Sequence, residues 1–251
     1  MNSTVERFSN RVENYAKYRP GYPPEMMEFF KTELGLTTAS VVADIGSGPG
    51  LSTKPFLENG GLVYGVEPNG GMRAAGESFL KDFPNFRSVN GNATETGLDS
   101  GSVDLIVAAQ AFHWFDPEPT RKEFKRILKP NSYVALIWNE RQLDSTPFLR
   151  EYEQLLLKYA TDYEKVRHEN IDQEKIGNFF QKSFEQRTFR NDQVHDFDGL
   201  KGRLLSSSYM PSGGDERFDE MIGELETLFA KHARDGKITI LYDTNVFCSQ
   251  F

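Results

Sequence analysis

The stretch VVADIGSGPG, from Val41 to Gly50, constrains the fold of this chain more than any other. Its β-branched and apolar residues predict a buried strand, and the alternating glycines that follow predict an abrupt turn. Turns of this kind lead into a helix and bring bare backbone amides close to an anionic group of a ligand. The stretch therefore predicts strand, turn and helix around a small anionic ligand.

A regular alternation of short β-rich runs and helical stretches continues this pattern to about Glu140. Such alternation predicts a parallel sheet with crossover helices. The expected parallel strands cover residues 41–45, 62–67, 86–90, 103–108 and 133–138.

After Arg141 the periodicity becomes helical. Apolar residues share one helix face in 148–159 and again in 218–229, with Arg234 expected in the last turn of the second helix. The segment ITILYDTNVF predicts a long last strand, and residues 184–189 are a further strand candidate. We expect an α/β fold with a Rossmann-like seven-stranded sheet, five or more strands parallel and the last antiparallel, helices on both faces and an inserted helical roof.

Composition limits the function classes. The chain has 37 acidic and 29 basic residues, a net charge of −8 and no block of lysine or arginine, which argues against a nucleic-acid partner. No apolar run approaches the roughly 18 residues that a membrane span requires. Cys248 is the only cysteine, so no disulfide or cysteine metal site is expected, and we expect a cytoplasmic protein without a membrane partner.

The glycine spacing narrows the choice of ligand. The glycines stand at Gly46, Gly48 and Gly50. A dinucleotide fingerprint would place its third glycine one position later, where this chain has Leu51. Glu67 ends the second expected strand, where an acid can accept both ribose hydroxyls, although a capping role is the alternative. These features favour a nucleoside that carries a carboxylate or phosphate tail.

Pro55 limits where the helix after the glycine turn begins. Because proline lacks an N–H, it is tolerated only in the first turn, so the helix is expected to start near Gly50 or Leu51. That start would leave the backbone amides around Gly48 free to face the anionic group.

With these motifs the chain resembles the class I S-adenosylmethionine-dependent methyltransferases, in the small-molecule branch often called methyltransferase type 11, over nearly its whole length. The resemblance implies that the D-x-G-x-G-x-G turn holds the methionine half of S-adenosylmethionine and that Glu67 binds its ribose. After the third strand, GNATE offers Asn92 and Ala93 for adenine, with asparagine where the family more often has aspartate. The implied cofactor contacts are Asp44, Gly46, Ser47, Gly48, Glu67, Pro68, Met72, Asn92, Ala93 and Gln110.

The segment VDLIVAAQAFHWFD resembles the fourth-strand signature of this branch. It places Gln110 at the strand end and His113 and Trp114 on the loop over the cofactor. The alternative is that His113 and Trp114 only pack with Phe112 and Phe115 as an aromatic cluster. Met72 likewise has two interpretations, a contact to adenine or a core residue.

The N-terminal segment FSNRVENYAKYRPGYP concentrates tyrosines before the core. Pro20 and Pro23 interrupt a helix there and pin the segment, as a lid over a ligand requires, although an amphipathic cap is the alternative. By the resemblance, Tyr15 and Arg19 would lie near the methionine end and the acceptor, where Arg19 could pair with a carboxylate.

Methyl transfer requires alignment more than a dedicated nucleophile, because the sulfonium is already a good leaving group. The expected proton acceptors are His113 and Tyr15, with Glu140 as a further alternative, and a carboxylate acceptor would need none. The residues expected at the acceptor are Arg19, Trp114, Arg141 and Tyr209.

The expected organisation has four regions. Residues 1–36 form an N-terminal arm and first helix that act as a lid, and 37–140 form the cofactor-binding core. Residues 141–236 form a helical insert and sixth strand that make a substrate roof, and 237–251 form the final strand that returns to the sheet.

We therefore expect an S-adenosylmethionine-dependent methyltransferase that acts on a small molecule. Two alternatives remain. One is a nicotinamide-dependent oxidoreductase, against which Leu51 argues. The other is a non-catalytic S-adenosylmethionine-binding regulatory protein, because methyl transfer leaves no diagnostic nucleophile in a sequence.

Overall fold

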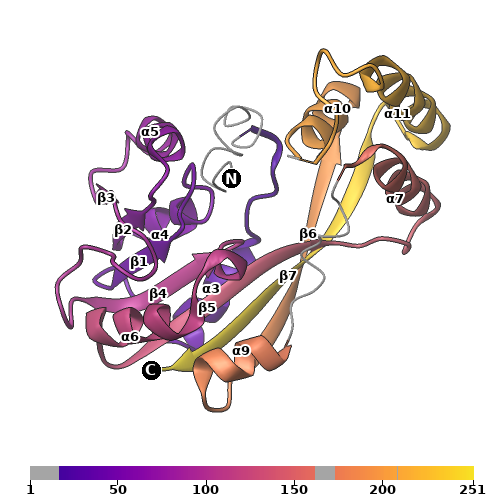
Figure 1. Ribbon diagram of the computed structural model, residues 1–251. Coiled ribbons are helices and arrows are strands. Elements are labelled where there is room, and N and C mark those ends of the chain that lie inside the picture. The colour runs from indigo at the N-terminus through magenta and orange to yellow at the C-terminus, as the bar shows by residue number, and fades with distance from the viewer. Residues whose placement is uncertain (1–16, 162–172, 208) are drawn as a thin grey trace.

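The computed structural model describes residues 17–161, 173–207 and 209–251 (Figure 1). Its helices are α3 (Pro24–Thr32), α4 (Thr53–Glu58), α5 (Gly70–Phe79), η1 (Phe112–Trp114), α6 (Pro117–Ile127), α7 (Pro147–Tyr159), α9 (Gln173–Phe180), α10 (Phe197–Leu205) and α11 (Phe218–His232). Its strands are β1 (Val41–Ile45), β2 (Leu62–Val66), β3 (Phe86–Val89), β4 (Val103–Ala109), β5 (Leu128–Arg141), β6 (Glu185–His195) and β7 (Ile238–Gln250). Residues 1–16 of the predicted arm lie outside the described residues.

The strands form one sheet in the order β3-β2-β1-β4-β5-β7-β6. β1 to β5 pair in parallel, and β7 runs antiparallel to both β5 and β6. The predicted Rossmann-like α/β fold and its antiparallel last strand are therefore confirmed. Because the strand order reverses between β1 and β4, their carboxyl ends open a crevice of the kind in which such sheets bind ligands.

The predicted strands of the core are confirmed to within one residue for β1, β2, β3 and β4, but β5 and β6 were predicted too short. β5 runs from Leu128 to Arg141, beyond the predicted 133–138. β6 continues to His195, although 184–189 was predicted. The second half of β6 is polar because it is an edge strand with alternate side chains exposed, and its pairing with β7 supplies the order that its own sequence does not signal.

Two hydrophobic clusters cover opposite faces of the sheet, so the predicted helices on both faces are confirmed. On one face, α6 and α9 contribute Phe124 and Phe179. On the other face, α3 and α4 contribute Phe30 and Phe56. Successive residues of β4 from 105 to 109 alternate between the two clusters, as the pleat of a strand requires.

A third hydrophobic cluster joins α7, α10 and α11 to the first residues of β7, and we call these three helices the roof. Figure 1 shows the roof gathered where β6 and β7 extend away from α4 and α5. The apolar faces predicted in 148–159 and 218–229 lie in this cluster. α11 ends at His232, so Arg234 lies beyond its last turn, where it pairs with Lys237 across a tight turn into β7.

The helix after the glycine turn starts later than predicted. α4 begins at Thr53 rather than near Gly50 or Leu51. The turn continues through these residues, and the backbone N–H of Lys54 donates to the carbonyl of Gly50 at 3.0 Å. Pro55 does lie in the first turn, where its missing N–H leaves no hydrogen bond unmade.

Within the described residues, no helix combines the length and the apolar character needed to cross a bilayer. The same part of the chain brings together no group of histidine, cysteine, aspartate and glutamate that could hold a metal ion. Cys248 is a buried free thiol in β7.

Candidate functional site

A cavity of about 500 Å³ opens at the carboxyl edge of the sheet. We call the end formed by the turns after β1, β2, β3 and β4 the turn end, and the end formed by residues 19–22, 139–141, the roof and β7 the roof end. The predicted site residues that line the cavity are Arg19, Gly46, Ser47, Gly48, Glu67, Pro68, Met72, Asn92, Ala93, Gln110, His113, Trp114, Glu140, Arg141 and Tyr209. Asp44 is not among the lining residues, and Tyr15 lies outside the described residues.

The three glycines of the turn serve different purposes, and all have positive φ. A Cβ on Gly46 would lie 2.7 Å from the Ala111 Cβ, and one on Gly50 would lie 2.6 Å from Leu80 Cδ1. These two positions are therefore glycine because the neighbouring residues pack against them. A Cβ on Gly48 would meet nothing within 4 Å. Gly48 is the position where the turn leaves room for a ligand.

Asp44 supports the turn from below rather than facing the cavity. It is fully buried, and its Oδ2 accepts hydrogen bonds of 2.7 Å from both Ser52 Oγ and Thr53 Oγ1. Its Oδ1 has no partner among the described residues. Burial raises the pKa of this carboxyl to about 6, even though the two hydroxyls favour the charged form. The predicted contact between Asp44 and the cofactor stays a prediction. The buried position of Asp44 outside the cavity lining argues against a direct contact.

Glu67 occupies the place that the sequence predicted for an anionic group of the ligand. Its Oε2 accepts from the backbone N–H of Gly48 at 3.0 Å, and its Oε1 accepts from the N–H of Asn69 at 2.8 Å. The prediction that the Gly48 amide is free is therefore wrong in this structure. Burial raises the pKa of Glu67 despite these two hydrogen bonds. Each carboxylate oxygen keeps a further lone pair for a hydroxyl donor.

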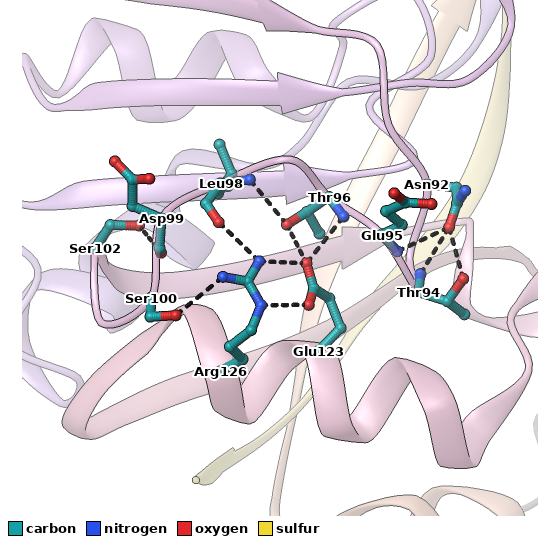
Figure 2. A network of polar contacts seen from close by, with 10 residues as sticks. All are labelled: Asn92, Thr94, Glu95, Thr96, Leu98, Asp99, Ser100, Ser102, Glu123 and Arg126. Atoms are coloured by element: carbon teal, nitrogen blue, oxygen red, sulfur yellow. Dashed lines mark hydrogen bonds and ion pairs between the residues drawn. The ribbon is translucent and has the colours of Figure 1, made fainter.

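The loop after β3 forms a compact turn around Asn92. The Asn92 side-chain oxygen accepts from Thr94 N and Thr94 Oγ1, both at 2.8 Å, and from Glu95 N at 3.0 Å (Figure 2). That oxygen was predicted to accept from an adenine amino group, but here the turn uses it. Buried Met72 and Ala93 lie at the same part of the cavity. An adenine contact from Asn92 stays a prediction and would require this turn to open.

An ion pair on α6 between Glu123 and Arg126, which was not predicted from the sequence, supports this loop. Glu123 accepts from Thr96 N at 2.9 Å and from Arg126 Nε at 2.7 Å, and Arg126 Nη2 also donates to the Leu98 carbonyl at 2.7 Å. Figure 2 shows this network beneath the loop that carries Asn92. The hydrogen bond from Arg126 lowers the pKa of Glu123 to about 2, with Thr96 contributing. The network fixes the loop without lining the cavity.

The end of β4 carries two unusual features. Gln110 has a φ of 57°, donates from Nε2 to the Asn139 carbonyl at 3.1 Å, and has a buried Oε1 without a partner among the described residues. Phe112 is buried and packs edge-on against Phe179, with ring centroids 4.7 Å apart. Phe115 packs edge-on against Phe112 and Phe124, so the aromatic packing role belongs to Phe112 and Phe115.

His113 and Trp114 face the cavity instead of the core. Trp114 is 46% exposed, and its ring centroid lies 4.5 Å from that of His113. The His113 ring also contacts the open cavity, but the protein around it lowers its pKa to about 4 by desolvation. His113 is neutral at neutral pH, as a proton acceptor must be.

The roof end contains Arg19 and two further arginines. The predicted residue, Arg141, forms a buried ion pair with Glu153 of α7 and lies over the ring of Tyr152 at 5.3 Å. Its charge is therefore neutralised, in contrast to its predicted role as a partner of the acceptor. Arg203 of α10 also lines the cavity but was not predicted, because a lone arginine in an amphipathic helix usually lies in solvent.

Side chains of the sheet hold the described end of the N-terminal arm at the roof end. The Gly21 carbonyl accepts from Asn139 Nδ2 at 3.0 Å and from Asn191 Nδ2 at 2.8 Å. The Tyr18 ring lies so close to α10 that a Cβ on Gly202 would be 2.3 Å from it. In Figure 1 the indigo segment leading into α3 runs between α5 and α10. The arm therefore connects the core to the roof beside the cavity.

Residues 43–136 match a family model described as "Methyltransferase domain". An uncharacterized methyltransferase of Schizosaccharomyces pombe is 34% identical over 152 residues, which cover 60% of this chain and 59% of that protein. One of Mycobacterium bovis is 35% identical over 134 residues, which cover 53% of this chain and 52% of that protein. The chain thus spans little more than half the length of these relatives.

Solved structures show the same fold at low identity. A structure from Anaeromyxobacter dehalogenans superposes with a TM-score of 0.68 at 18% identity, covering 93% of this chain and 98% of that one. Phosphoethanolamine N-methyltransferase 2 of Haemonchus contortus, solved with S-adenosyl-L-methionine, gives 0.55 at 16% identity, covering 99% of this chain and 57% of that one. At such identities the likeness concerns the arrangement of strands and helices alone.

Proposed function

Because this chain belongs to the class I methyltransferase family, we propose that it transfers a methyl group from S-adenosylmethionine to a small-molecule acceptor. The observation that carries the proposal is the opening at Gly48, where the glycine turn, Glu67 and Ala93 line one cavity. A turn with room at its middle glycine can bring its backbone against a ligand. If neighbouring side chains filled the space at Gly48, the turn could only connect β1 to α4 and could not contact a ligand.

Four features of the turn end fit S-adenosylmethionine. The space beside Gly48 suits the methionine half. Glu67 keeps lone pairs for the ribose hydroxyls. Met72 and Ala93 offer apolar surface to adenine, and the buried Oε1 of Gln110 has no donor among the described residues.

When bound, S-adenosylmethionine supplies a methyl group on a sulfonium that is already a good leaving group. The residues of the chain then have to align the acceptor and exclude water. Arg19 and the roof would enclose the acceptor opposite the glycine turn. Neutral His113 would accept a proton from a hydroxyl or amine acceptor, with Tyr15 and Glu140 as alternatives.

The choice of a small acceptor rests on enclosure and charge. The roof and the arm border the cavity, so a folded macromolecule would have to displace them to reach it. A net charge of −8 also disfavours a nucleic acid. The cytoplasmic location inferred from the single cysteine is part of the same proposal.

Thermal shift separates this proposal from a nicotinamide-dependent oxidoreductase. We expect S-adenosylmethionine and S-adenosylhomocysteine to raise the Tm. At a hundredfold excess over Kd, ligand binding should increase the free energy of unfolding by about 2.7 kcal/mol. NAD and NADP should leave the Tm unchanged, because Leu51 lines the cavity where a dinucleotide fingerprint has glycine. Stabilisation by a dinucleotide and by neither adenosyl compound would contradict the proposal.

Turnover separates an enzyme from a regulatory protein that only binds the nucleoside. A screen of small hydroxyl, amine and carboxylate compounds should give release of S-adenosylhomocysteine that depends on the acceptor. Binding of S-adenosylmethionine without turnover of any compound class would favour the regulatory alternative. Bulk transfer RNA and ribosomal RNA should give no turnover.

A further inference from the structure

Arg203 places a buried positive charge beside the cavity. Its side chain lines the roof end, and the residue is 7% exposed. Nε donates to the Tyr242 hydroxyl at 2.8 Å, and Nη1 donates to Ser206 Oγ and Ser207 Oγ at 3.4 and 3.1 Å. These three partners are neutral hydroxyls, so none of them balances the charge.

The described part of the chain supplies no carboxylate to Arg203. Over residues 17–161, 173–207 and 209–251, no acidic side chain forms an ion pair with it, and its Nη2 makes no hydrogen bond. A guanidinium stays charged at every physiological pH. Removing such a charge from water without an anionic partner is costly. The guanidinium also lies over the Tyr242 ring, 5.8 Å from its centroid, and this contact offsets part of the cost without supplying a negative charge.

Arg141 lines the same cavity and has a different charge balance. Arg141 and Glu153 are both 8% exposed in their side chains and form an ion pair, so together they bring no net charge. Among the described residues, the partners of Arg203 are neutral, so this arginine does bring a net charge. The two arginines therefore differ in charge balance although both line the roof end.

We propose that Arg203 binds a carboxylate of the methyl acceptor, which makes the acceptor a small carboxylic acid. This inference rests on the proposed function and names the substrate class of the same site. The two N–H groups of Nη2 can donate to a carboxylate, and one positive charge matches one negative charge. Because three hydroxyls fix the guanidinium before the acceptor arrives, little orientation is lost on binding.

Arg19 brings a second guanidinium to the same turn. Its Nη2 donates to the carbonyl of Ser206 at 3.3 Å, and its side chain lines the cavity. The hydroxyl of Ser206 is a partner of Arg203. An acceptor carboxylate bound at Arg203 would therefore lie near a second guanidinium at the roof end.

The test uses the full chain saturated with S-adenosylhomocysteine and measures the further rise in Tm with added small compounds. Succinate, citrate and benzoate are each compared with the corresponding amide, and inorganic phosphate is a separate arm. We expect the acids to raise the Tm of the wild-type protein further and the amides not to. Arg203→Gln should weaken carboxylate binding about 30-fold or more while the S-adenosylhomocysteine shift is kept.

A structural role for Arg203 predicts a different result. If Arg203 only stabilises the fold, Arg203→Gln should lower the Tm of the unliganded protein. If Arg203 is kept for binding, removing its buried charge should leave that Tm unchanged or raise it. Arg203→Lys keeps the positive charge but loses the planar guanidinium with its paired N–H donors. It should therefore retain part of the response to carboxylates. The matched control is Arg150→Gln, an exposed arginine of α7 that donates to the Asp144 carbonyl at 2.7 Å. It should behave as wild type.

Three results would overturn the inference. In the first, the wild-type protein shows the S-adenosylhomocysteine shift but responds equally to acids and amides. In the second, Arg203→Gln keeps the response to acids. In the third, phosphate stabilises as well as the carboxylates do, which would indicate a general oxyanion site. Absence of the S-adenosylhomocysteine shift itself would count against the proposed function instead.

Discussion

The two ends of the cavity are built in different ways. The turn end comes from residues 46–116, in which each strand of the parallel sheet contributes the turn that follows it. The roof end combines residues that come together only in the folded chain, namely Arg19, Pro20, Tyr22, Asn139, Glu140, Arg141, Arg203, Tyr209 and Tyr242. The turn end is therefore a property of the sheet, and the roof end is a property of how the roof and arm pack on it.

The ends also differ in charge. At the turn end, Glu67 presents a carboxylate that can accept from hydroxyl groups. At the roof end, Arg203 presents a guanidinium with neutral partners. A ligand that spans both ends would therefore combine hydroxyl donors on one side with an anion on the other.

The largest expected effect disables the turn end alone. Gly48→Val fills the space beside the turn, so S-adenosylhomocysteine affinity should fall about 100-fold or more, measured by calorimetry. Gly101→Val is the matched control, because Gly101 also has open space and a similar φ, +60° against +55°. Both variants strain the backbone, but Gly101 does not line the cavity. Equal losses in the two variants would show that strain, not occupied space, causes the effect.

The turn end could be predicted because its residues follow one another in the sequence. Gly46, Gly48 and Glu67 line the cavity as the motif suggested. The contact between Gly48 and Glu67 could not be predicted, because it depends on the register that places β1 beside β2. The motif identifies the residues, and the sheet decides which of their hydrogen-bonding groups are already used.

The roof end was predicted only in part, because its side chains acquire their roles from distant partners. Arg141 was correctly expected at the cavity, but Glu153, twelve residues later on α7, neutralises it. Arg203 was missed, since nothing in FDGLKGRLL indicates that its arginine is buried. Burial of a polar side chain depends on how helices dock, and no local pattern records this.

The second prediction disables the roof end and leaves the turn end intact. Gly202→Val would place a side chain against the Tyr18 ring, where even a Cβ would lie at 2.3 Å, and so displace the end of the arm. Turnover of an acceptor found by the screen should fall about 30- to 100-fold through lost alignment, with S-adenosylhomocysteine affinity unchanged. Gly223→Val on α11 is the control, because its Cβ would meet nothing within 4 Å. A parallel loss of affinity would show that the two ends are not independent.

The third prediction concerns pH and stability at the turn end. Burial raises the pKa of Asp44 from 3.8 to about 6, so between these pH values the folded protein binds more protons than the unfolded chain. The contribution of Asp44 to the free energy of unfolding therefore falls by roughly 1–3 kcal/mol as pH rises through this window. His113 has the opposite sign, because its pKa is lowered from 6.5 to about 4. Stability from His113 rises with pH over that range.

Denaturant unfolding from pH 4 to 7 can separate these contributions. Asp44→Asn keeps an oxygen for Ser52 and Thr53, so it should be more stable than wild type at pH 7 and similar at pH 4. Burial also raises the pKa of Glu67, and the charge of Glu67 raises the pKa of Asp44, so the difference between the two proteins reports Asp44 together with its interaction with Glu67. A difference that does not change with pH would show that Asp44 is charged throughout.

The smallest expected effect tests whether the turn end needs support from outside the cavity. Arg126→Gln removes the ion pair to Glu123 and the hydrogen bond to the Leu98 carbonyl, and so loosens the loop that carries Asn92 and Ala93. S-adenosylhomocysteine affinity should weaken by about 3- to 10-fold, because the adenine side loses preorganisation without losing a contact.

Lys129→Gln is the control for that variant, since Lys129 pairs with Asp104 at 2.8 Å and neither residue lines the cavity. A partly exposed ion pair of this kind contributes at most about 1 kcal/mol to stability, and its loss should not change ligand affinity. If Arg126→Gln also binds S-adenosylhomocysteine as wild type does, the loop after β3 is ordered by the Asn92 turn itself. The turn end would then be ordered by its own motifs alone, and it would differ from the roof end more strongly, because the roof end depends on distant partners.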